Sequence, residues 1–345
     1  MLKRGQVVAV LANFCWVHLD QPGPAGQQRL LCTRRTRLGK SGQTICVGDW
    51  VQVDGIDWAS ARGAVAQVEP RQLALLRPPV ANITRVVVVA ALAEPALDPL
   101  QLTRFLITAE ASGAAVELVF SKADLVPQDQ VVRWLQRAVG WGYAPLALSE
   151  RDAASLEPLR QRLATAGVSV LCGPSGVGKS SLINALIPAL QLRVAAVSGR
   201  LQRGRHTTRH VELFTLAPGA YLADTPGFNR PQLPEQSEEL QACFPELRAA
   251  SRQGRCQFSD CLHQGEPGCT VAADWDRRPL YDQCLQELFS AREGVAAAQR
   301  PADRGSVRQR GDRLEPRLEG QYRRRSRRGQ RQQTLAELNP PDPEG

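Results

Sequence analysis

The segment Gly173-Pro174-Ser175-Gly176-Val177-Gly178-Lys179-Ser180 decides the fold of this 345-residue chain. It reads G-x-x-x-x-G-K-S, with an apolar run over 168–172 before it and apolar residues at helical spacing over 181–187 after it. A strand, a glycine-rich loop and a helix in this order are typical of a phosphate-binding P-loop. Glycine lets the backbone close around an anion, and the loop amides and the helix N-terminus then point at the phosphates. We expect Lys179 to reach the β- and γ-phosphates, the Ser180 hydroxyl to hold Mg²⁺, and Ser181 to complete the nucleotide-binding set.

The P-loop lies within a longer alternation of strand and helix patterns. The run over 86–90 is entirely apolar, as expected of a strand buried on both faces of a parallel sheet. The alternation predicts an α/β domain whose mostly parallel sheet is covered on both faces. Strands are predicted over 85–90, 116–120, 145–148, 168–172, 210–216 and 220–223, and helices over 100–111, 131–138, 156–164 and 181–187.

A second motif, Ser121-Lys122-Ala123-Asp124, stands at the end of a predicted strand upstream of the P-loop. It is similar to the N-K-x-D motif with which GTPases read guanine. There the carboxylate accepts from the ring N–H and the exocyclic amine, and the lysine stem packs over the base. Ser121 replaces the asparagine, and its buried hydroxyl can still tie this loop to the P-loop. Ser149, at the end of the next strand, matches the loop whose backbone contacts the guanine oxygen. An exposed loop with a salt pair is the alternative interpretation.

A switch motif, Asp224-Thr225-Pro226-Gly227-Phe228, follows the strand predicted over 220–223. We expect Asp224 to hold Mg²⁺ through water and the Gly227 amide to sense the γ-phosphate. A plain β-turn is the competing interpretation. The motif that reads the base precedes the P-loop, which is the reverse of the usual GTPase order. The same sheet can be built if the chain is circularly permuted, and the switch motif then leads directly into the next domain.

The segment Gly204-Arg205-His206-Thr207-Thr208 lies between the P-loop and the switch motif. One of the two threonines, Thr207 or Thr208, is expected to complete the Mg²⁺ shell. Phe228 occupies the position at which many GTPases carry a glutamine that orients the attacking water. His206 is the candidate to replace it, because an imidazole can orient a water or accept its proton. A solvated loop histidine is the alternative.

A cysteine-rich segment follows the predicted GTPase domain. Its residues Cys256, Cys261, His263 and Cys269 have the spacing C-x4-C-x-H-x5-C. Three thiols and one imidazole make a closed tetrahedral shell for one structural Zn²⁺. The segment is short and polar, so a metal would supply the stability that a small core cannot. Unpaired cysteines with a surface histidine are the alternative, and helices are expected to flank the site over 238–243 and 280–292.

Residues 1–78 have the pattern of a small β-domain. Turn-rich stretches separate β-prone runs over 6–11, 28–33, 50–53 and 64–68, which suggests an OB-like barrel. A basic cluster within it either faces nucleic acid or forms a solvated loop. The cluster comprises Arg34, Arg35, Arg37 and Lys40.

Composition separates a folded body from a basic tail. The net charge is +9, and residues 300–331 carry twelve arginines against four acidic residues. With almost no aromatic residues, the tail should be disordered. The run over 323–328 suits RNA phosphates, and a solubilising tail is the alternative. The longest apolar run, 86–93, is much shorter than a membrane span, and the nine cysteines without an export signal do not suggest a disulfide framework. A cytoplasmic monomer without membrane contact is expected.

These motifs together resemble the RsgA (YjeQ/EngC) family of circularly permuted GTPases. The resemblance rests on G-P-S-G-V-G-K-S-S, G-R-H-T-T, D-T-P-G-F and the cysteine–histidine cluster with E-P-G-C, and it covers roughly residues 1–295. It implies an N-terminal OB barrel, a central permuted GTPase and a C-terminal helical zinc domain. It also implies a role in late maturation of the small ribosomal subunit, with binding to its rRNA, and points to His206. Ser121, the few lysines and the arginine-rich tail depart from the family pattern.

The sequence therefore predicts a GTP-hydrolysing assembly factor that binds the small subunit in its GTP form and leaves after hydrolysis. Two alternatives remain: a non-catalytic RNA-binding module that uses nucleotide as a structural ligand, and an ATPase, against which Asp124 argues. The expected domains are an OB-like RNA-binding domain over 1–78, the GTPase over 79–232, the zinc domain over 233–298 and the tail over 299–345.

Overall fold

The computed structural model describes residues 2–34, 44–76, 79–149, 151–190, 211–224, 230–272, 274–299, 307–310 and 313–316. The chain divides into two units, Met1–Phe289 and Ser290–Gly345. The β-domain, the P-loop domain and the cysteine-rich segment belong to the first unit, and the arginine-rich tail belongs to the second.

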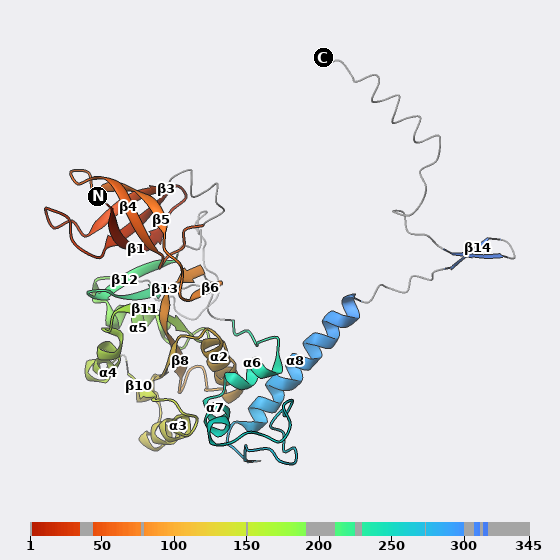
Figure 1. The fold of residues 1–345 in the computed structure, drawn as a ribbon. Helices are drawn as coiled ribbons and strands as arrows, with labels where there is room; N and C mark the ends of the chain where they lie inside the picture. Colours follow the sequence, from red (N-terminus) through yellow and green to blue (C-terminus); the bar gives the residue numbers. More distant parts are fainter. Residues whose placement is uncertain are drawn as a thin grey trace. The chain divides into compact units, whose positions relative to one another are not determined.

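The N-terminal strands close into a barrel, drawn in red to orange in Figure 1. β1 pairs with both β2 and β4, and β3 runs parallel to β5, so no edge strand is left among the five. Their inward side chains, among them Val7, Val17 and Leu30, form a separate core. The barrel strands are β1 (Lys3–Val10), β2 (Phe14–Leu19), β3 (Arg29–Arg34), β4 (Trp50–Asp57) and β5 (Arg62–Val68).

Four of these five strands match the sequence prediction, and β2 was not predicted. Its inward residues are buried and alternate as in any half-buried strand. Its outward residues are Phe14, which is 40% exposed, Trp16, which packs against the neighbouring core, and His18, which bonds to Tyr221. Because two of these three outward side chains are large and aromatic, the strand lacks the apolar–polar alternation by which sequence reasoning detects strands.

The central domain contains a six-stranded sheet in the order β10-β9-β8-β11-β13-β12. All neighbouring strands are parallel except β12, which is antiparallel to β13. This is the mostly parallel sheet that the sequence predicted. Its strands are β8 (Ile83–Ala91), β9 (Ala115–Ser121), β10 (Leu146–Ala147), β11 (Gly167–Cys172), β12 (Glu212–Ala217) and β13 (Ala220–Asp224).

Helices cover both faces of this sheet, as the alternating pattern predicted. Val86, Val88 and Ala90 of β8 belong to the core beneath α2 and α3, whereas Val87 and Val89 belong to the core beneath α4 and α5. β8 is therefore apolar on both faces because it is covered on both. The helices are α2 (Pro99–Ala111), α3 (Gln128–Gly140), α4 (Ala153–Leu163) and α5 (Lys179–Leu186), with 3-10 turns η1 (Ala123–Leu125) and η2 (Pro188–Leu190).

The barrel and the central sheet form one continuous hydrogen-bonded sheet. β1 pairs with β12 at Ala9 and Glu212, and the Tyr221 hydroxyl shares a hydrogen bond of 2.7 Å with His18 Nδ1. The connecting segment carries the hairpin β6 (Ala74–Leu76) and β7 (Pro79–Ala81).

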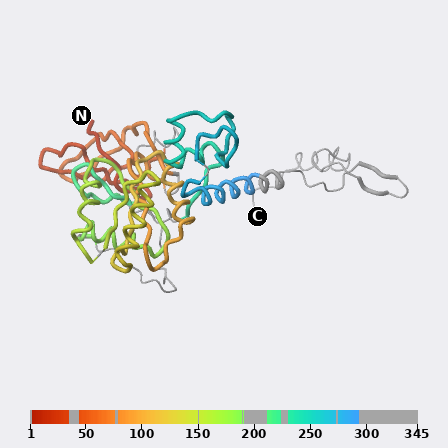
Figure 2. The backbone as a smooth tube through the Cα atoms, turned by 90° about the horizontal axis from the view of Figure 1, so that it is seen from below, coloured from red at the N-terminus to blue at the C-terminus, as the bar shows by residue number. Residues whose placement is uncertain are grey.

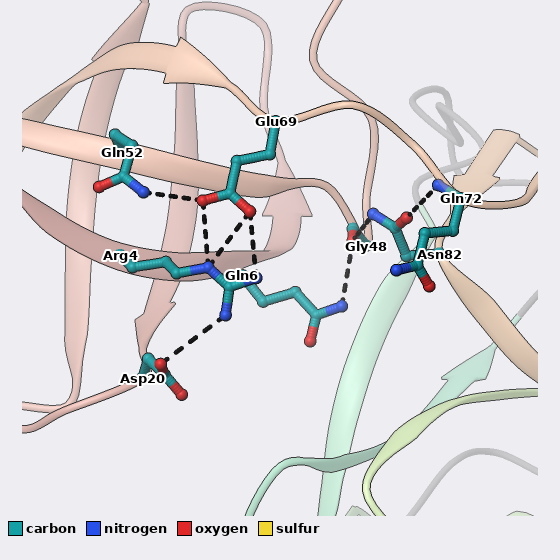
Figure 3. Close-up of polar contacts among 8 residues, drawn as sticks. All are labelled: Arg4, Gln6, Asp20, Gly48, Gln52, Glu69, Gln72 and Asn82. Carbon is teal, nitrogen blue, oxygen red and sulfur yellow. Dashed lines mark hydrogen bonds and ion pairs between the residues drawn. The ribbon is translucent and has the colours of Figure 1, made fainter.

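A polar network fixes this connecting segment to the barrel (Figure 3). The Gly48 carbonyl accepts from both the Gln6 and Asn82 side-chain amides at 3.0 Å. Asn82 Oδ1 accepts from the Gln72 backbone amide at 2.9 Å. The Arg4 guanidinium donates to both carboxylate oxygens of Glu69 in a bidentate pair. Both ends of the connection are thus anchored to barrel strands.

The cysteine-rich segment and three helices form the C-terminal domain, whose loops gather into one lobe, shown in teal in Figure 2. Its small core includes Leu240, Phe244, Leu247 and Tyr281. α8 contains the helix predicted over 280–292, α6 matches the one predicted over 238–243 except for its last residue, and α7 was not predicted. The helices are α6 (Ser237–Ala242), α7 (Pro245–Gln253) and α8 (Arg278–Gln299).

The arginine-rich tail contains a short hairpin. Within the tail expected to be disordered, β14 (Val307–Arg310) and β15 (Arg313–Pro316) form an antiparallel hairpin. The strands flank Gly311-Asp312, a residue pair that favours tight turns.

Among the helices that the structure describes, none is long and apolar enough to span a membrane.

Candidate functional site

The predicted P-loop connects β11 to α5 in the expected strand–loop–helix arrangement. A Cβ on Gly173 would lie 2.2 Å from the Val89 carbonyl oxygen, so only glycine fits against β8. Gly176 and Gly178 have φ of 83° and 92°, the left-handed conformation that glycine adopts without strain. These constraints shape a backbone cradle at the N-terminus of α5.

Lys179, the first residue of α5, reaches back over the loop. Its Nζ donates to the carbonyls of Gly173 at 2.9 Å and Pro174 at 2.6 Å. The ammonium group therefore lies at the mouth of the cradle, where an incoming phosphate would meet it. Ser180 and Ser175 are exposed beside it, and Ser181 is half-buried.

The predicted base-reading loop contacts the P-loop directly. Ser121 ends β9, and its Oγ donates to the Val177 carbonyl at 2.6 Å. This is the tie between the two loops that the sequence suggested for a buried hydroxyl. Lys122 follows with a left-handed φ of 54°, and its Nζ donates to the Glu94 carbonyl. The Ala123 amide donates to the Leu148 carbonyl at 3.1 Å, which joins this loop to the end of β10.

The loop after β10 brings two more residues to this edge. The Ser149 amide donates to Ser155 Oγ at 3.0 Å, and Ser149 Oγ accepts from the Arg151 amide at 3.2 Å. Arg151 Nε lies 3.7 Å from Asp124 Oδ2. Sequence reasoning did not identify Arg151, although it stands only two residues beyond the predicted contact Ser149.

The switch residues are placed only in part. Asp224 ends β13, which is parallel to and paired with β11, so its backbone lies at the same edge of the sheet as the P-loop. The Asp224 side chain, His206, Thr207, Thr208 and Gly227 lie outside the described residues. The carboxyl ends of parallel strands form the ligand-binding edge of such sheets. All the described candidates for nucleotide binding are at that edge.

The four predicted zinc ligands converge in one cluster. Their ligand atoms all lie within 4.8 Å of one another. His263 Nδ1 is 3.7 Å from the sulfurs of Cys256 and Cys261 and 3.4 Å from that of Cys269, and the sulfurs of Cys256 and Cys269 are 4.0 Å apart. A tetrahedral Zn²⁺ with bonds of about 2.0–2.3 Å requires donor atoms roughly 3.4–3.8 Å apart. The donor set fits a zinc ion, and the three distances from His263 to the sulfurs have this spacing, whereas the 4.0 Å between the sulfurs of Cys256 and Cys269 is slightly wider.

The surroundings of the cluster also suit a metal site. The amides of Thr270 and Val271 point at the sulfurs of Cys256 and Cys269, at 3.5 and 3.4 Å. Hydrogen bonds from Thr270 lower the pKa of Cys256, whereas burial raises that of Cys261 to about 12. Burial lowers the pKa of His263, which favours the neutral imidazole that a metal requires.

A carboxylate that sequence reasoning missed closes the ligand loop. Glu266 accepts from the amides of Leu262 at 2.8 Å and Gln264 at 2.7 Å. From α8, the Tyr281 hydroxyl donates to the Leu262 carbonyl at 2.7 Å. The cluster is thus attached to the helical core by hydrogen bonds to its backbone.

Comparison with known proteins agrees with this architecture. The family described as RsgA GTPase matches residues 68–234. The small ribosomal subunit biogenesis GTPase RsgA of Synechococcus sp. (strain CC9605) is 56% identical over 286 residues, which cover 83% of this chain and 94% of that protein. The protein of the same name from Thermosynechococcus vestitus is 47% identical over 331 residues, covering 95% and 94%.

Two solved structures share the fold. The crystal structure of YjeQ from Thermotoga maritima has a TM-score of 0.69 and 28% identity, covering 84% of this chain and 98% of that one. YloQ, described as a circularly permuted GTPase, has a TM-score of 0.69 and 27% identity, covering 85% and 96%. With these relatives, and with the permuted order of its motifs on one sheet, the chain belongs to the RsgA family of GTPases.

Proposed function

We propose that this chain hydrolyses GTP to GDP and phosphate as a factor in late assembly of the small ribosomal subunit. In this proposal it binds the subunit and its rRNA in the GTP form and leaves after hydrolysis, a cycle that belongs to the cytoplasm. The observation that carries the proposal is the hydrogen bond between Ser121 and Val177, which joins the expected base-reading and phosphate-binding loops. The names of the relatives supply the ribosomal role.

Each candidate residue has a distinct task in this proposal. The P-loop amides and Lys179 hold the β- and γ-phosphates, and Asp124 selects guanine with support from Lys122, Ala123 and Ser149. The γ-phosphate is sensed by the Gly227 amide, and His206 orients the attacking water.

Magnesium would be held by Ser180, by Asp224 through water, and by Thr207 or Thr208. When bound, the ion would supply positive charge that offsets the negative charge of the phosphates during transfer. Ser180 is an exposed residue in the first turn of α5, directly after Lys179, which supports this assignment.

In this proposal the remaining domains attach the chain to the small subunit. One Zn²⁺ per chain, held by Cys256, Cys261, His263 and Cys269, would stabilise the C-terminal domain. The barrel and the arginine-rich tail would contact rRNA, with the chain acting as a monomer.

The test is GTP hydrolysis by the full chain with and without purified small ribosomal subunits. The proposal predicts slow intrinsic turnover that the subunits stimulate. Turnover that subunits do not raise would instead favour the alternative of an RNA-binding module with nucleotide as a structural ligand. Equal competition by ATP against labelled GTP would favour an ATPase.

A further inference from the structure

Beside the expected guanine site lies an ion pair to which neither the motifs nor the names of the relatives assign a role. Arg151 Nε is 3.7 Å from Asp124 Oδ2, the carboxylate expected to read the base. The Arg151 side chain is 82% exposed and the Asp124 side chain 28% exposed, so the pair lies at the protein surface with the carboxylate as its more buried member. No other ion pair involves Asp124 among the described residues.

The backbone around Arg151 is fixed from several directions. Ser155 Oγ accepts from the Ser149 amide at 3.0 Å. Its single proton can be donated to the carbonyl of Asp152 at 2.7 Å or to that of Ser149 at 3.0 Å. The Asp152 carboxylate accepts from the Ala154 amide at 3.0 Å and begins α4. Hydrogen bonds therefore hold the backbone at Ser149 and at Asp152, on either side of Arg151.

The facing loop is held to the same frame. The Ala123 amide donates to the Leu148 carbonyl at 3.1 Å, and the Leu125 amide donates to the Lys122 carbonyl at 3.1 Å. Asp124 and Arg151 thus belong to two loops with a shared hydrogen bond between them. The fold therefore holds the backbones of these two loops together without a nucleotide.

The chemistry of the carboxylate decides what this pair does. A carboxylate has two oxygens and about four acceptor positions. Guanine would take one position on each oxygen, through its ring N–H and its exocyclic amine. An outer position on Oδ2 stays available for Arg151, so base and arginine need not compete.

We propose that Arg151 is a positioning residue for guanine recognition: its guanidinium, 3.7 Å from Asp124 Oδ2, steadies the Asp124 carboxylate for contact with the base. The inference rests on the proposed function, because it needs Asp124 to read guanine. Exposed ion pairs contribute modestly, so loss of Arg151 should weaken guanine nucleotides by about two- to fivefold. The loss should be equal for GTP and GDP, since the γ-phosphate is not involved.

The test is a double-mutant cycle measured with fluorescent nucleotides on the full chain. Asp124→Asn replaces one acceptor oxygen of the carboxylate by an amide donor. That donor suits the carbonyl that xanthine carries in place of the exocyclic amine of guanine, so the variant should exchange guanine for xanthine nucleotides. Arg151→Ala should weaken GDP in the wild-type background yet leave XDP unchanged in the Asp124→Asn background, because the carboxylate on which Arg151 acts is absent there. Arg151→Lys, which keeps the charge, should recover most of the loss, and added salt should reduce it.

Arg133→Ala is the matched control, because Arg133 is also an exposed arginine paired with an aspartate, Asp129, at 2.7 Å. It should leave GDP affinity unchanged. An equal loss of XDP affinity in the Asp124→Asn background would overturn the proposal, since Arg151 would then contact base or phosphate directly. Unchanged GDP affinity in Arg151→Ala, or the same loss in Arg133→Ala, would overturn it as well. If the wild-type chain bound ADP as well as GDP, guanine reading itself would fail, and the proposed function with it.

Discussion

Ser121 Oγ donates a 2.6 Å hydrogen bond to the carbonyl of Val177, and this bond joins the end of β9 to the phosphate-binding loop. Ser121 is 5% exposed, and its hydroxyl has a single proton. That proton is used on Val177, so none remains to contact the base. Ser121 therefore fixes the spacing of the two loops, and recognition of the base falls to Asp124 and the loop after β10.

Removing the Ser121 hydroxyl should weaken nucleotide binding without changing the fold. Ser121→Ala leaves the buried Val177 carbonyl without this donor, and an unsatisfied buried group costs about 1–3 kcal/mol. We expect lower GDP affinity by titration and a lower melting temperature. Ser121→Thr keeps a hydroxyl and serves as the control. GDP affinity in Ser121→Ala equal to that of the wild type would show that the tie has no role in binding.

The shape of the P-loop and the convergence of the cysteine–histidine cluster were predictable from the sequence, because these segments follow backbone rules. The P-loop needs glycine where φ is positive and where Gly173 approaches β8 closely. The sequence shows this requirement directly as glycines at fixed positions of the motif. The four zinc ligands are close in sequence and therefore close in space. Motifs of this kind carry their geometry with them.

The contacts between distant segments were not predictable. Arg277 is fully buried, bonded to Glu246 and placed over the rings of Trp141, Tyr143 and Phe244. In the sequence it is only one arginine among many. Such a site depends on α3 and the C-terminal helices meeting in three dimensions, which composition and periodicity do not encode.

Neutralising Glu246 should loosen the C-terminal domain. Glu246→Gln leaves the buried Arg277 guanidinium without a compensating charge, and breaking a buried pair costs about 3–5 kcal/mol. Denaturant unfolding of the full chain should therefore show a large loss of stability. Arg137→Ala breaks a more exposed pair with Asp276 in the same interface and should cost about 1 kcal/mol or less. Equal effects of the two variants would contradict this account.

The cysteine–histidine cluster should contain one zinc ion per chain in protein purified without chelator. Cys261→Ser removes one of four donors, so we expect loss of the metal and loosening of the C-terminal domain. Elemental analysis measures the first effect and limited proteolysis the second. Cys243→Ser is the control, because Cys243 is buried in the helical core outside the cluster. Protein without zinc that keeps a protease-resistant C-terminal domain would refute a structural metal.

The arginine-rich tail should add salt-dependent affinity for rRNA. Each phosphate that a protein neutralises contributes about 0.7–0.9 to the slope of log affinity against log salt. Truncation after residue 300 removes eleven of the twelve arginines in 300–331, so the slope should fall. The measurement is rRNA binding at several salt concentrations. GTP hydrolysis without RNA is the control and should not change, and an unchanged slope would mean that the tail does not contact the RNA.

The last prediction concerns the attacking water. Phe228 cannot form a hydrogen bond from its side chain, so the residue after D-T-P-G does not orient the water as glutamine does in many GTPases. His206 precedes the threonines expected at Mg²⁺, and its imidazole can orient a water or accept its proton. His206→Ala should therefore lower subunit-stimulated hydrolysis by roughly 10²-fold or more, while GTP affinity stays near normal. Single-turnover hydrolysis on purified small subunits measures the effect. His210→Ala, a histidine four positions further along, is the matched control and should keep full activity. Full stimulated activity in His206→Ala would remove this residue from the mechanism and assign the water to the backbone or to rRNA.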